Sequence, residues 1–369
     1  MKKILIVFGT RPEAIKMAPL VKELKKHTEF NTKVCVTAQH REMLDQVLGF
    51  FKITPDYDLD LMEANQTLNQ LSARVLTAID NVLVDIEPDL VLVHGDTSTS
   101  SMVALASFYR GIKVGHVEAG LRTYNKLAPF PEEINRQITG RLADIHFAPT
   151  EQSAQNLINE GANSSSVHIT GNTVIDALLW GINHVNEQRE DIQEIKKFIK
   201  TDKKLIVVTG HRRENFGNKF YEFCSALKEL ANRADVQLIY PVHLNPNVQK
   251  AVYDTLGDHS NILLIPPLDY EAFIWLLNHS YLIITDSGGV QEEAPTLKKP
   301  VLVTREFTER QEAVLEETVK LVGTNKNKIV KEAFLLLDNK KEYQRMIGNK
   351  NPYGDGTASK QIATILKNF

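Results

Sequence analysis

Cysteine is nearly absent from this chain of 369 residues, which has only Cys35 and Cys224. Two separated thiols cannot build a disulfide framework, and neither belongs to a CxxC pair of the kind that binds structural zinc. Long apolar runs are missing as well. The apolar run at residues 4–8 is too short for the core of a signal peptide, and no stretch approaches the ~20 apolar residues of a membrane span. These absences predict a cytoplasmic protein with reduced thiols.

An excess of charge of either sign is also lacking. The 43 Lys and Arg residues nearly balance the 46 Asp and Glu residues, and the formal net charge is −3. We therefore expect no nucleic-acid partner and no membrane partner, because both would draw on a basic excess. Hydrophobic residues at 43% and charged residues at 24% are typical of a globular chain with a large core. The length suits two α/β domains.

Three familiar motifs are absent. No GxGxxG follows the first apolar strand, which argues against a dinucleotide cofactor. The chain has no GxxxxGK[ST] phosphate loop and no GxSxG nucleophile turn. A nicotinamide enzyme, a P-loop hydrolase and a hydrolase with that nucleophile are therefore disfavoured, and we expect no cofactor.

What the chain does have is a regular alternation of short β-branched runs and longer segments with helical spacing. This alternation predicts βαβ units and hence parallel sheets. We predict two Rossmann-like, doubly wound domains with an interdomain cleft: residues 1–171, residues 172–352, and a C-terminal helix within 353–369 that packs back on the first domain. The predicted strands are 4–8, 33–37, 90–94, 113–117, 146–148, 167–170, 204–209, 237–241, 262–265, 281–285, 300–304 and 319–322. The predicted helices include 12–26, 71–86, 329–337, 342–347, 359–366 and an exposed one within 187–204.

Polar residues crowd the ends of these strands. The segments that follow seven of them read GTRPE, TAQH, HGDT, HVEAG, TGHRRE, PVH and TDSGG. In open parallel sheets, ligands bind beyond the carboxyl ends of the strands. Packing does not explain so many His, Arg, Asp, Glu and Gly residues there, so the sequence predicts a ligand site at these strand ends.

The segment TDSGG ends a strand and opens a helix. Free backbone N–H groups at a helix start, with two glycines allowing close approach, favour a phosphate or diphosphate ligand. A helix cap by Ser287 explains the same residues without any ligand. Arg11, Lys16 and Arg310 could supply cations suited to diphosphate oxygens, although each alone is most simply a surface charge.

Acidic residues are the second chemical feature. Asp96 and Glu118 end two strands, Glu132 opens a proline-flanked helix start, and Arg136 lies about one turn later. If the two strands are neighbours, Asp96 and Glu118 meet at one edge of the sheet, where carboxylates can move protons. Helix capping explains Asp96 well and Glu118 poorly. His211, at a strand end in the second domain, could contact a phosphate, act as a general acid or serve a structural role.

A metal site is the alternative use of the same strand ends. His94, Asp96, His116 and Glu118 are all ligand types. Residues two apart on a strand share a face, so both pairs could point the same way. Their spacing nevertheless fits no known metal motif well, and the paired cysteines of a zinc deaminase are missing. We therefore predict no metal.

Ten segments in order carry a resemblance to a known family. They are GTRPEAIKMAPL, TAQHREMLDQVL, VLVHGDT, VGHVEAGLRT, PEEINR, ITGNTVIDAL, VTGHRRE, YPVHLNP, TDSGGVQEEAP and NPYGDG. Together they resemble the bacterial non-hydrolysing UDP-N-acetylglucosamine 2-epimerases. The resemblance runs from residue 4 to about residue 356, and several of the segments are longer than eight residues.

This resemblance implies a glycosyltransferase-B-like fold, a homodimer and the reversible conversion of UDP-N-acetylglucosamine into UDP-N-acetylmannosamine for cell-surface polysaccharides. The family's catalytic positions match Asp96, Glu118, Glu132, Arg136 and His211. Its nucleotide-sugar contacts match Arg11, Lys16, Phe273, Ser287, Gly288, Gly289, Glu293 and Arg310. Bacterial members bind a second UDP-N-acetylglucosamine as an allosteric activator, at positions that match Gln39, His40, Arg74, Arg212 and His243.

Two positions depart from the family pattern. Gln311 stands where the family commonly has proline, so the loop that carries Arg310 loses a fixed φ. Leu268 stands where some relatives have a polar side chain near the uracil. These departures affect contacts with the nucleotide and leave the expected reaction unchanged.

Three other functions remain open from the sequence. A retaining glycosyltransferase of the same fold would share the diphosphate site but would need no base at C2. An epimerase for a related UDP-diacetamido-uronic acid would need one more cationic contact. A catalytically silent UDP-sugar sensor would not need the acidic residues. The apolar helix at 71–86 could form a dimer face or simply pack in the core.

Overall fold

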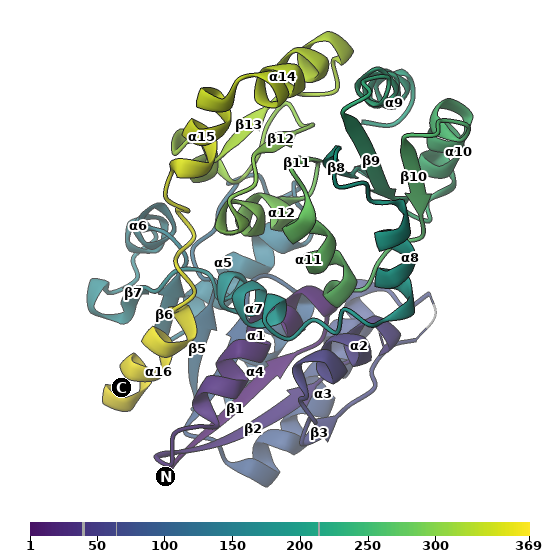
Figure 1. The fold of residues 1–369 in the computed structure, drawn as a ribbon. Helices are drawn as coiled ribbons and strands as arrows, with labels where there is room; N and C mark the ends of the chain where they lie inside the picture. The colour runs from purple at the N-terminus through teal and green to yellow at the C-terminus, as the bar shows by residue number, and fades with distance from the viewer. Residues whose placement is uncertain (39–40, 64, 213–214) are drawn as a thin grey trace. The chain divides into compact units, whose positions relative to one another are not determined.

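The computed structural model of the protein describes residues 1–38, 41–63, 65–212 and 215–369 (Figure 1). The chain divides into two compact units: unit 1 comprises Met1–Trp180 and Tyr353–Phe369, and unit 2 comprises Gly181–Pro352. Each unit holds one sheet whose strand pairs are all parallel, with helices between successive strands. The predicted fold class, two doubly wound α/β domains, is confirmed.

The sheet of unit 1 has seven strands in the described residues, in the order β3-β2-β1-β4-β5-β6-β7. The order reverses between β1 and β4, and this is the point where open α/β sheets bind ligands. The strands are β1 (Lys2–Phe8), β2 (Phe30–Val36), β3 (Tyr57–Asp58), β4 (Leu90–His94), β5 (Lys113–Val117), β6 (Ile145–Ala148) and β7 (Val167–Ile169).

Side-chain caps set the starts of two helices in unit 1. Thr10 and Glu13 form a reciprocal capping box at α1, and Thr97 caps α4 by accepting a hydrogen bond from the backbone N–H of Ser100. These caps fix the turns that follow β1 and β4. The helices are α1 (Arg11–Leu24), α2 (Arg41–Phe51), α3 (Leu68–Ile86), α4 (Ser98–Tyr109), α5 (Glu132–Leu142), α6 (Glu151–Asn159), α7 (Thr173–Ile182) and α16 (Ala358–Asn368), with a 3-10 turn at Ser164–Ser166.

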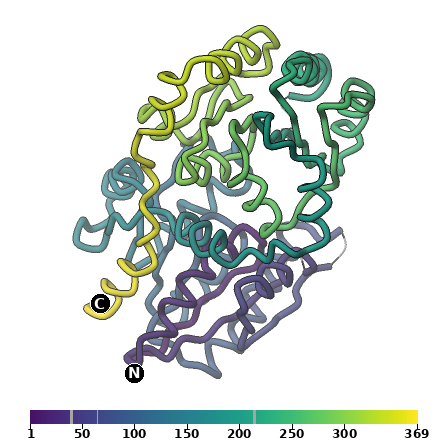
Figure 2. Tube along the Cα trace, viewed as in Figure 1, coloured from purple at the N-terminus to yellow at the C-terminus, as the bar shows by residue number. Residues whose placement is uncertain are grey.

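The C-terminal segment belongs to unit 1. Helix α16 packs beside α1, so the two ends of the chain lie in the same unit (Figure 2). Lys2 Nζ donates a hydrogen bond to the carbonyl of Leu366 at 2.9 Å. The buried carboxylate of Asp176, on α7, accepts the backbone N–H of Ser359 at 2.8 Å. The first segment of unit 1 extends to Trp180, nine residues beyond the predicted boundary at residue 171, and so includes most of α7.

The sheet of unit 2 has six strands in the described residues, in the order β10-β9-β8-β11-β12-β13. Its order reverses between β8 and β11. The strands are β8 (Lys204–Thr209), β9 (Val236–Pro241), β10 (Ile262–Ile265), β11 (Leu282–Thr285), β12 (Val301–Val303) and β13 (Val319–Leu321). The helices are α8 (Glu190–Phe198), α9 (Asn218–Ala231), α10 (Pro246–Leu256), α11 (Tyr270–His279), α12 (Gly288–Glu293), α13 (Gln311–Leu315), α14 (Lys326–Asp338) and α15 (Lys340–Gly348), with a 3-10 turn at Ala294–Leu297.

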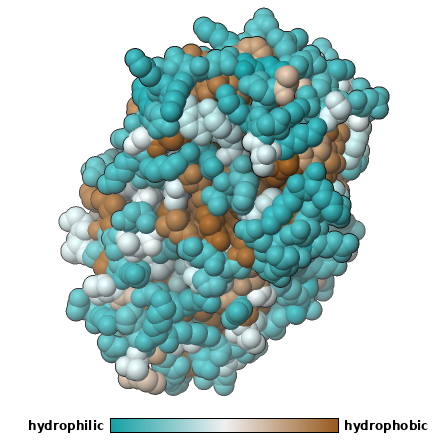
Figure 3. Space-filling model, viewed as in Figure 1, coloured by the Kyte–Doolittle hydropathy of each residue, from teal (hydrophilic) through white to brown (hydrophobic). Residues whose placement is uncertain are grey.

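Burial follows the parallel architecture. Residues 4–8 of β1 are fully buried, as expected of a strand covered on both faces. All the predicted strands are present, and the strand that the sequence missed, β3, has two residues at the sheet edge and too little pattern to detect. Hydrophilic residues cover most of the face seen in Figure 3. None of the helices in the described ranges combines the length and apolar character that a membrane span requires.

Candidate functional site

Glu118 is the centre of the predicted site in unit 1. It follows β5 with a φ of 60°, in the left-handed region, and only 7% of it is exposed. Its Oε2 accepts hydrogen bonds from Lys16 Nζ and from Asn172 Nδ2, the latter at 2.8 Å, and His94 Nε2 lies 3.7 Å away. The other oxygen, Oε1, lies on the side of Gly95: a Cβ added to that glycine would be 3.7 Å from Oε1. Three groups therefore converge on one oxygen of this carboxylate.

These neighbours control the charge of Glu118. Burial opposes ionisation of the carboxyl, but the electrostatic interactions with Lys16 and His94 outweigh burial and hold the pKa of Glu118 well below its usual value. Glu118 is thus a carboxylate at neutral pH. In this form the side chain can accept a proton.

A second carboxylate lies at the end of the neighbouring strand. Asp96 forms an ion pair with Arg136 of α5, whose side chain is 8% exposed. Asn135 Nδ2 donates to the backbone carbonyl of Asp96 at 3.0 Å and fixes the turn after β4. The strand neighbours β4 and β5 thus bring Asp96 and Glu118 to one edge of the sheet, as the sequence predicted.

Glu132 and Glu133 begin α5 and have different environments. Glu133 is fully buried and accepts the backbone N–H groups of Thr123 at 3.0 Å and Tyr124 at 3.1 Å, so it anchors the loop after β5. Glu132 Oε2 is buried and has no hydrogen-bond partner among the described residues. Glu132 is therefore the member of the pair with an oxygen that a substrate could engage.

Glu13 is a buried acid that sequence reasoning did not single out. Only 2% exposed, its carboxylate accepts the backbone N–H groups of Gly9 and Thr10 at 3.0 and 2.8 Å. Thr97 Oγ1, in the turn after β4, donates to it at 2.7 Å. Glu13 thus connects the turn after β1 to the turn after β4. The capping-box pattern Thr-x-x-Glu in GTRPE was the available signal.

The strand ends of unit 1 do not suit a metal ion. Asp96 and Glu118 are each paired with a cation, and His116 Nε2 lies 2.7 Å from the carbonyl of Gly95. Among the described residues, no group of three or more His, Cys, Asp and Glu side chains is arranged to hold a metal.

In unit 2, Asp286 organises the ends of β8 and β11. This fully buried carboxylate accepts the backbone N–H groups of His211 and Arg212, both at 2.8 Å. The ring of His211 stacks on that of His243, with centroids 5.0 Å apart. Burial lowers the pKa of His211 although Asp286 opposes that effect, so the imidazole is neutral at physiological pH. Arg212 Nε is buried and has no hydrogen-bond partner among the described residues.

The segment TDSGG lies beside Arg310. Ser287 makes no side-chain capping hydrogen bond, and α12 has only six residues, so helix capping does not explain this segment. The guanidinium of Arg310 lies against Gly288, where an added Cβ would be 2.9 Å from Cζ. Arg310 Nε donates to Glu292 at 2.9 Å, and its Nη1 donates to Glu309 at 2.5 Å. Two acids thus orient the cation beside the glycines.

The loop that carries Arg310 is held without the family's proline. Gln311 Nε2 donates to the carbonyl of Thr308, and Thr308 Oγ1 donates to Gln291 Oε1 at 2.8 Å. The backbone N–H of Arg310 donates to Thr308 Oγ1 at 3.1 Å. Hydrogen bonds therefore restrain this loop in place of the fixed φ that a proline at position 311 would give. Leu268 lies in the turn before α11.

The remaining predicted residues are distributed as follows. Glu293 accepts a hydrogen bond from Tyr270 at 3.1 Å, and Phe273 is half-buried on α11. Arg11 begins α1 in unit 1, and Arg74, on α3, pairs with Glu63 at 2.6 Å. The predicted allosteric residues Gln39 and His40 lie outside the described residues.

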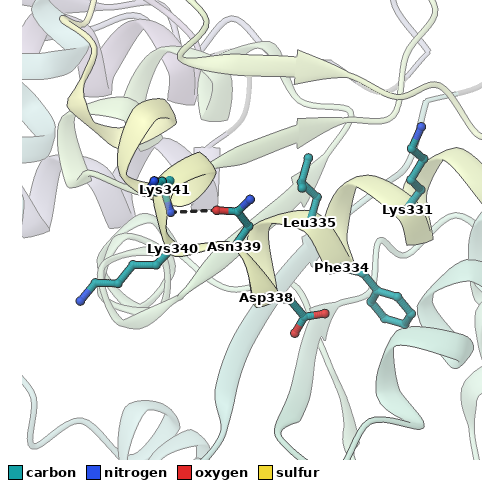
Figure 4. Close-up of a pocket in the computed structure, with 7 residues that line it drawn as sticks. All are labelled: Lys331, Phe334, Leu335, Asp338, Asn339, Lys340 and Lys341. Atoms are coloured by element: carbon teal, nitrogen blue, oxygen red, sulfur yellow. Dashed lines mark hydrogen bonds between the residues drawn. The ribbon is translucent and has the colours of Figure 1, made fainter.

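The hollow shown in Figure 4 is not part of these clusters. It has a volume of about 600 Å³, lies where α14 meets α15, and is lined by none of the site residues described above. The side chains of Lys331 and Lys340 point in different directions there (Figure 4). No group of polar atoms converges on a ligand at this place.

Comparisons with known proteins agree with one another. The family model described as UDP-N-acetylglucosamine 2-epimerase matches residues 22–367. The UDP-N-acetylglucosamine 2-epimerases of Escherichia coli K12 and Campylobacter jejuni are each 56% identical to this chain; the matches cover 99% of this chain and 98% and 97% of those proteins. The crystal structure of the Neisseria meningitidis UDP-GlcNAc 2-epimerase bound to UDP-GlcNAc is 48% identical, with a TM-score of 0.91 and coverage of 100% of both chains.

Proposed function

This chain belongs to the UDP-N-acetylglucosamine 2-epimerase family, and from that premise we propose that it reversibly converts UDP-N-acetylglucosamine into UDP-N-acetylmannosamine. In this proposal the enzyme is an isomerase of the non-hydrolysing type and uses no cofactor. The observation that carries it is the carboxylate of Glu118, which is buried, held through one oxygen and kept ionised.

Inversion at C2 requires removal of an unactivated C–H proton and its return to the other face. Departure of UDP meets this requirement, because positive charge develops at C1 and the ring oxygen and acidifies the neighbouring C2–H. Re-addition of UDP to the resulting 2-acetamidoglucal then completes the reaction. Proton transfer contributes ~10²–10⁴-fold, so stabilisation of the developing charges must supply the rest.

We assign the acid–base work to unit 1. Glu118, Asp96 and Glu132 are the candidates for removing and returning the C2 proton. Arg136 holds Asp96 through their ion pair. Lys16 pairs with Glu118, and Arg11 opens the helix that carries Lys16.

We assign the binding of the departing UDP to residues of unit 2 and to Arg11 of unit 1. Arg310 is a cation held by two acids beside Gly288, at the start of α12, which suits diphosphate oxygens. A neutral His211 can donate one hydrogen bond to the departing phosphate. The remaining nucleotide-sugar contacts are assigned to Phe273, Ser287, Gly289 and Glu293.

The test is ¹H NMR of the purified protein with UDP-N-acetylglucosamine alone. We expect signals of UDP-N-acetylmannosamine to grow to an equilibrium mixture, with small amounts of 2-acetamidoglucal and UDP on long incubation. An unchanged spectrum would exclude the proposal. A retaining glycosyltransferase would leave C2 untouched, and a sensor would bind without turnover.

Activity on a UDP-diacetamido-uronic acid is the nearest alternative within this chemistry. Competition between the two sugars in one assay separates them, because the preferred substrate has the higher kcat/KM. We expect UDP-N-acetylglucosamine to be preferred, in line with the ligand named for the meningococcal relative.

Further parts of the proposal concern the compartment, the oligomeric state, the pathway and the regulation of the enzyme. We propose a cytoplasmic homodimer that feeds cell-surface polysaccharide synthesis and is activated by a second UDP-N-acetylglucosamine. Arg212 and His243 are the described residues best suited to such an activator, since Arg212 Nε is buried with no hydrogen-bond partner in the part of the chain that the structure describes, and the exposed His243 stacks on the preceding residue, His211. A sigmoidal dependence of rate on substrate, made hyperbolic by Arg212→Ala, would support this role; hyperbolic kinetics in the wild type would exclude it.

A further inference from the structure

His94, the last residue of β4, has an unusual environment. It is 4% exposed, and its buried Nε2 has no hydrogen-bond partner within 3.5 Å among the described residues. This nitrogen lies 3.7 Å from Glu118 Oε2. Burying such a nitrogen costs free energy unless a polar group compensates it, and the carboxylate of Glu118 is the charged group that faces it.

Several ionisable groups face this imidazole. Glu118 follows β5, Glu13 and Lys16 lie on α1, and His116 lies on β5; each interacts electrostatically with His94 or with the carboxylate beside it. Glu13 accepts hydrogen bonds from Gly9, Thr10 and Thr97, all neutral donors, and His94 acts electrostatically on the same carboxylate. His94 is thus adjacent to two buried acids.

Three side chains from three separate parts of unit 1 meet at one oxygen of Glu118. Lys16 reaches Oε2 from α1, Asn172 from the turn before α7, and His94 from the end of β4. Oε1 is left on the side of Gly95, next to Asp96 in the chain. The two oxygens of the carboxylate therefore have different surroundings.

We propose that His94 is a positioning residue that acts through Glu118: with Lys16 and Asn172 it fixes Oε2, so that Oε1 is the oxygen that exchanges a proton with C2 of the substrate. The exchange with C2 rests on the proposed function, whereas the hold on Oε2 does not. His94 also contributes to the low pKa of Glu118, together with Lys16 and against the effect of burial.

The decisive variant is His94→Gln, which keeps a polar side chain but removes the group that can carry a positive charge. In ¹³C-labelled protein, we expect the carboxyl carbon of Glu118 to titrate about one pH unit higher than in the wild type. The acid limb of the kcat profile should move upward with it, while KM changes little. An unshifted Glu118 titration in the variant would overturn the proposal.

His146→Gln is the matched control. His146 is also a buried strand histidine of unit 1, at 2% exposure, and lies on β6. Its replacement should lower stability without moving the titration of Glu118. If His146→Gln shifted Glu118 as much as His94→Gln does, the effect would come from general loosening of the sheet, and the proposal would fail.

Two further outcomes are decisive. If the His94 variant does not fold, the ¹⁵N signal of His94 Nε2 in the wild type must still respond when Glu118 titrates; no response contradicts the proposal. If the wild type leaves UDP-N-acetylglucosamine unchanged, the proposed function fails. The NMR titration of Glu118 still decides the role of His94 in that case.

Discussion

At the scale of single residues, the neighbours of each acid separate the acids with an oxygen available to a ligand from those that hold the fold. Glu132 and Glu133 are adjacent in the chain, yet Glu133 anchors a loop and Glu132 keeps a buried oxygen without a partner among the described residues. The sequence could place both at a helix start, but only the resemblance to a family chose Glu132. Glu13 was missed because its contact with Thr97 joins positions 84 residues apart.

Replacement of Glu118 by Gln should abolish most turnover. The amide keeps the shape of the side chain but cannot take a proton, so we expect kcat to fall by ~10²–10⁴-fold. UDP binding should stay close to wild type, because the residues assigned to UDP are mostly in unit 2. Turnover by NMR and UDP binding by calorimetry measure the two effects, and wild-type turnover would remove Glu118 from the mechanism.

Two buried histidines should make stability depend on pH. Burial lowers the pKa of His116 to about 3 and that of His146 to about 4. The unfolded chain protonates these groups near pH 6.5, so below that pH it binds more protons than the folded chain, and stability falls toward pH 4. Urea unfolding at pH 7 and pH 5 measures the effect. His146→Gln should flatten the pH dependence, and an unchanged slope would contradict this assignment.

At the scale of elements, the order of the strands brings the predicted site segments of each unit together. The reversal between β1 and β4 places the turns GTRPE and HGDT side by side in unit 1, and the reversal between β8 and β11 does the same for TGHRRE and TDSGG in unit 2. The sequence predicted these strands from their β-branched runs. It could not give the partners of Asp286 or Arg310, which depend on tertiary contacts.

The start of α5 should hold the loop after β5 in place. Glu133→Ala removes the acceptor for the backbone N–H groups of Thr123 and Tyr124, which are then left without that partner. We expect the free energy of unfolding to fall by about 1–3 kcal/mol. Limited proteolysis should also cut within residues 119–131. The variant Glu151→Ala, at an exposed helix start, is the control and should leave both measurements close to wild type.

At the scale of the whole molecule, each unit has its own core and its own cysteine. Cys35 is buried on β2 of unit 1 and Cys224 on α9 of unit 2. Length and composition were enough to predict two α/β domains. They could not give the extent of unit 1, which depends on contacts of Asp176 and Leu366 with residues 183 and 364 positions away in the chain.

The reactivity of each cysteine thiol should report the unfolding of its own unit. Burial raises the pKa of each cysteine to about 12, so neither is a thiolate at neutral pH and neither should react with a thiol reagent in the native protein. In increasing urea, we expect each thiol to become reactive when its own unit opens, as followed by mass spectrometry of the labelled peptides. Rapid labelling of either cysteine without denaturant would contradict the packing described for that unit.

Removal and return of the C2 proton of UDP-N-acetylglucosamine by buried carboxylates is the step on which the proposed reaction depends. Its most direct test is the reaction in D₂O, followed by ¹H NMR and mass spectrometry. We predict that the product carries solvent deuterium at C2 and that the recovered substrate gains it as equilibrium is approached. Epimerisation without any deuterium at C2 would contradict the account.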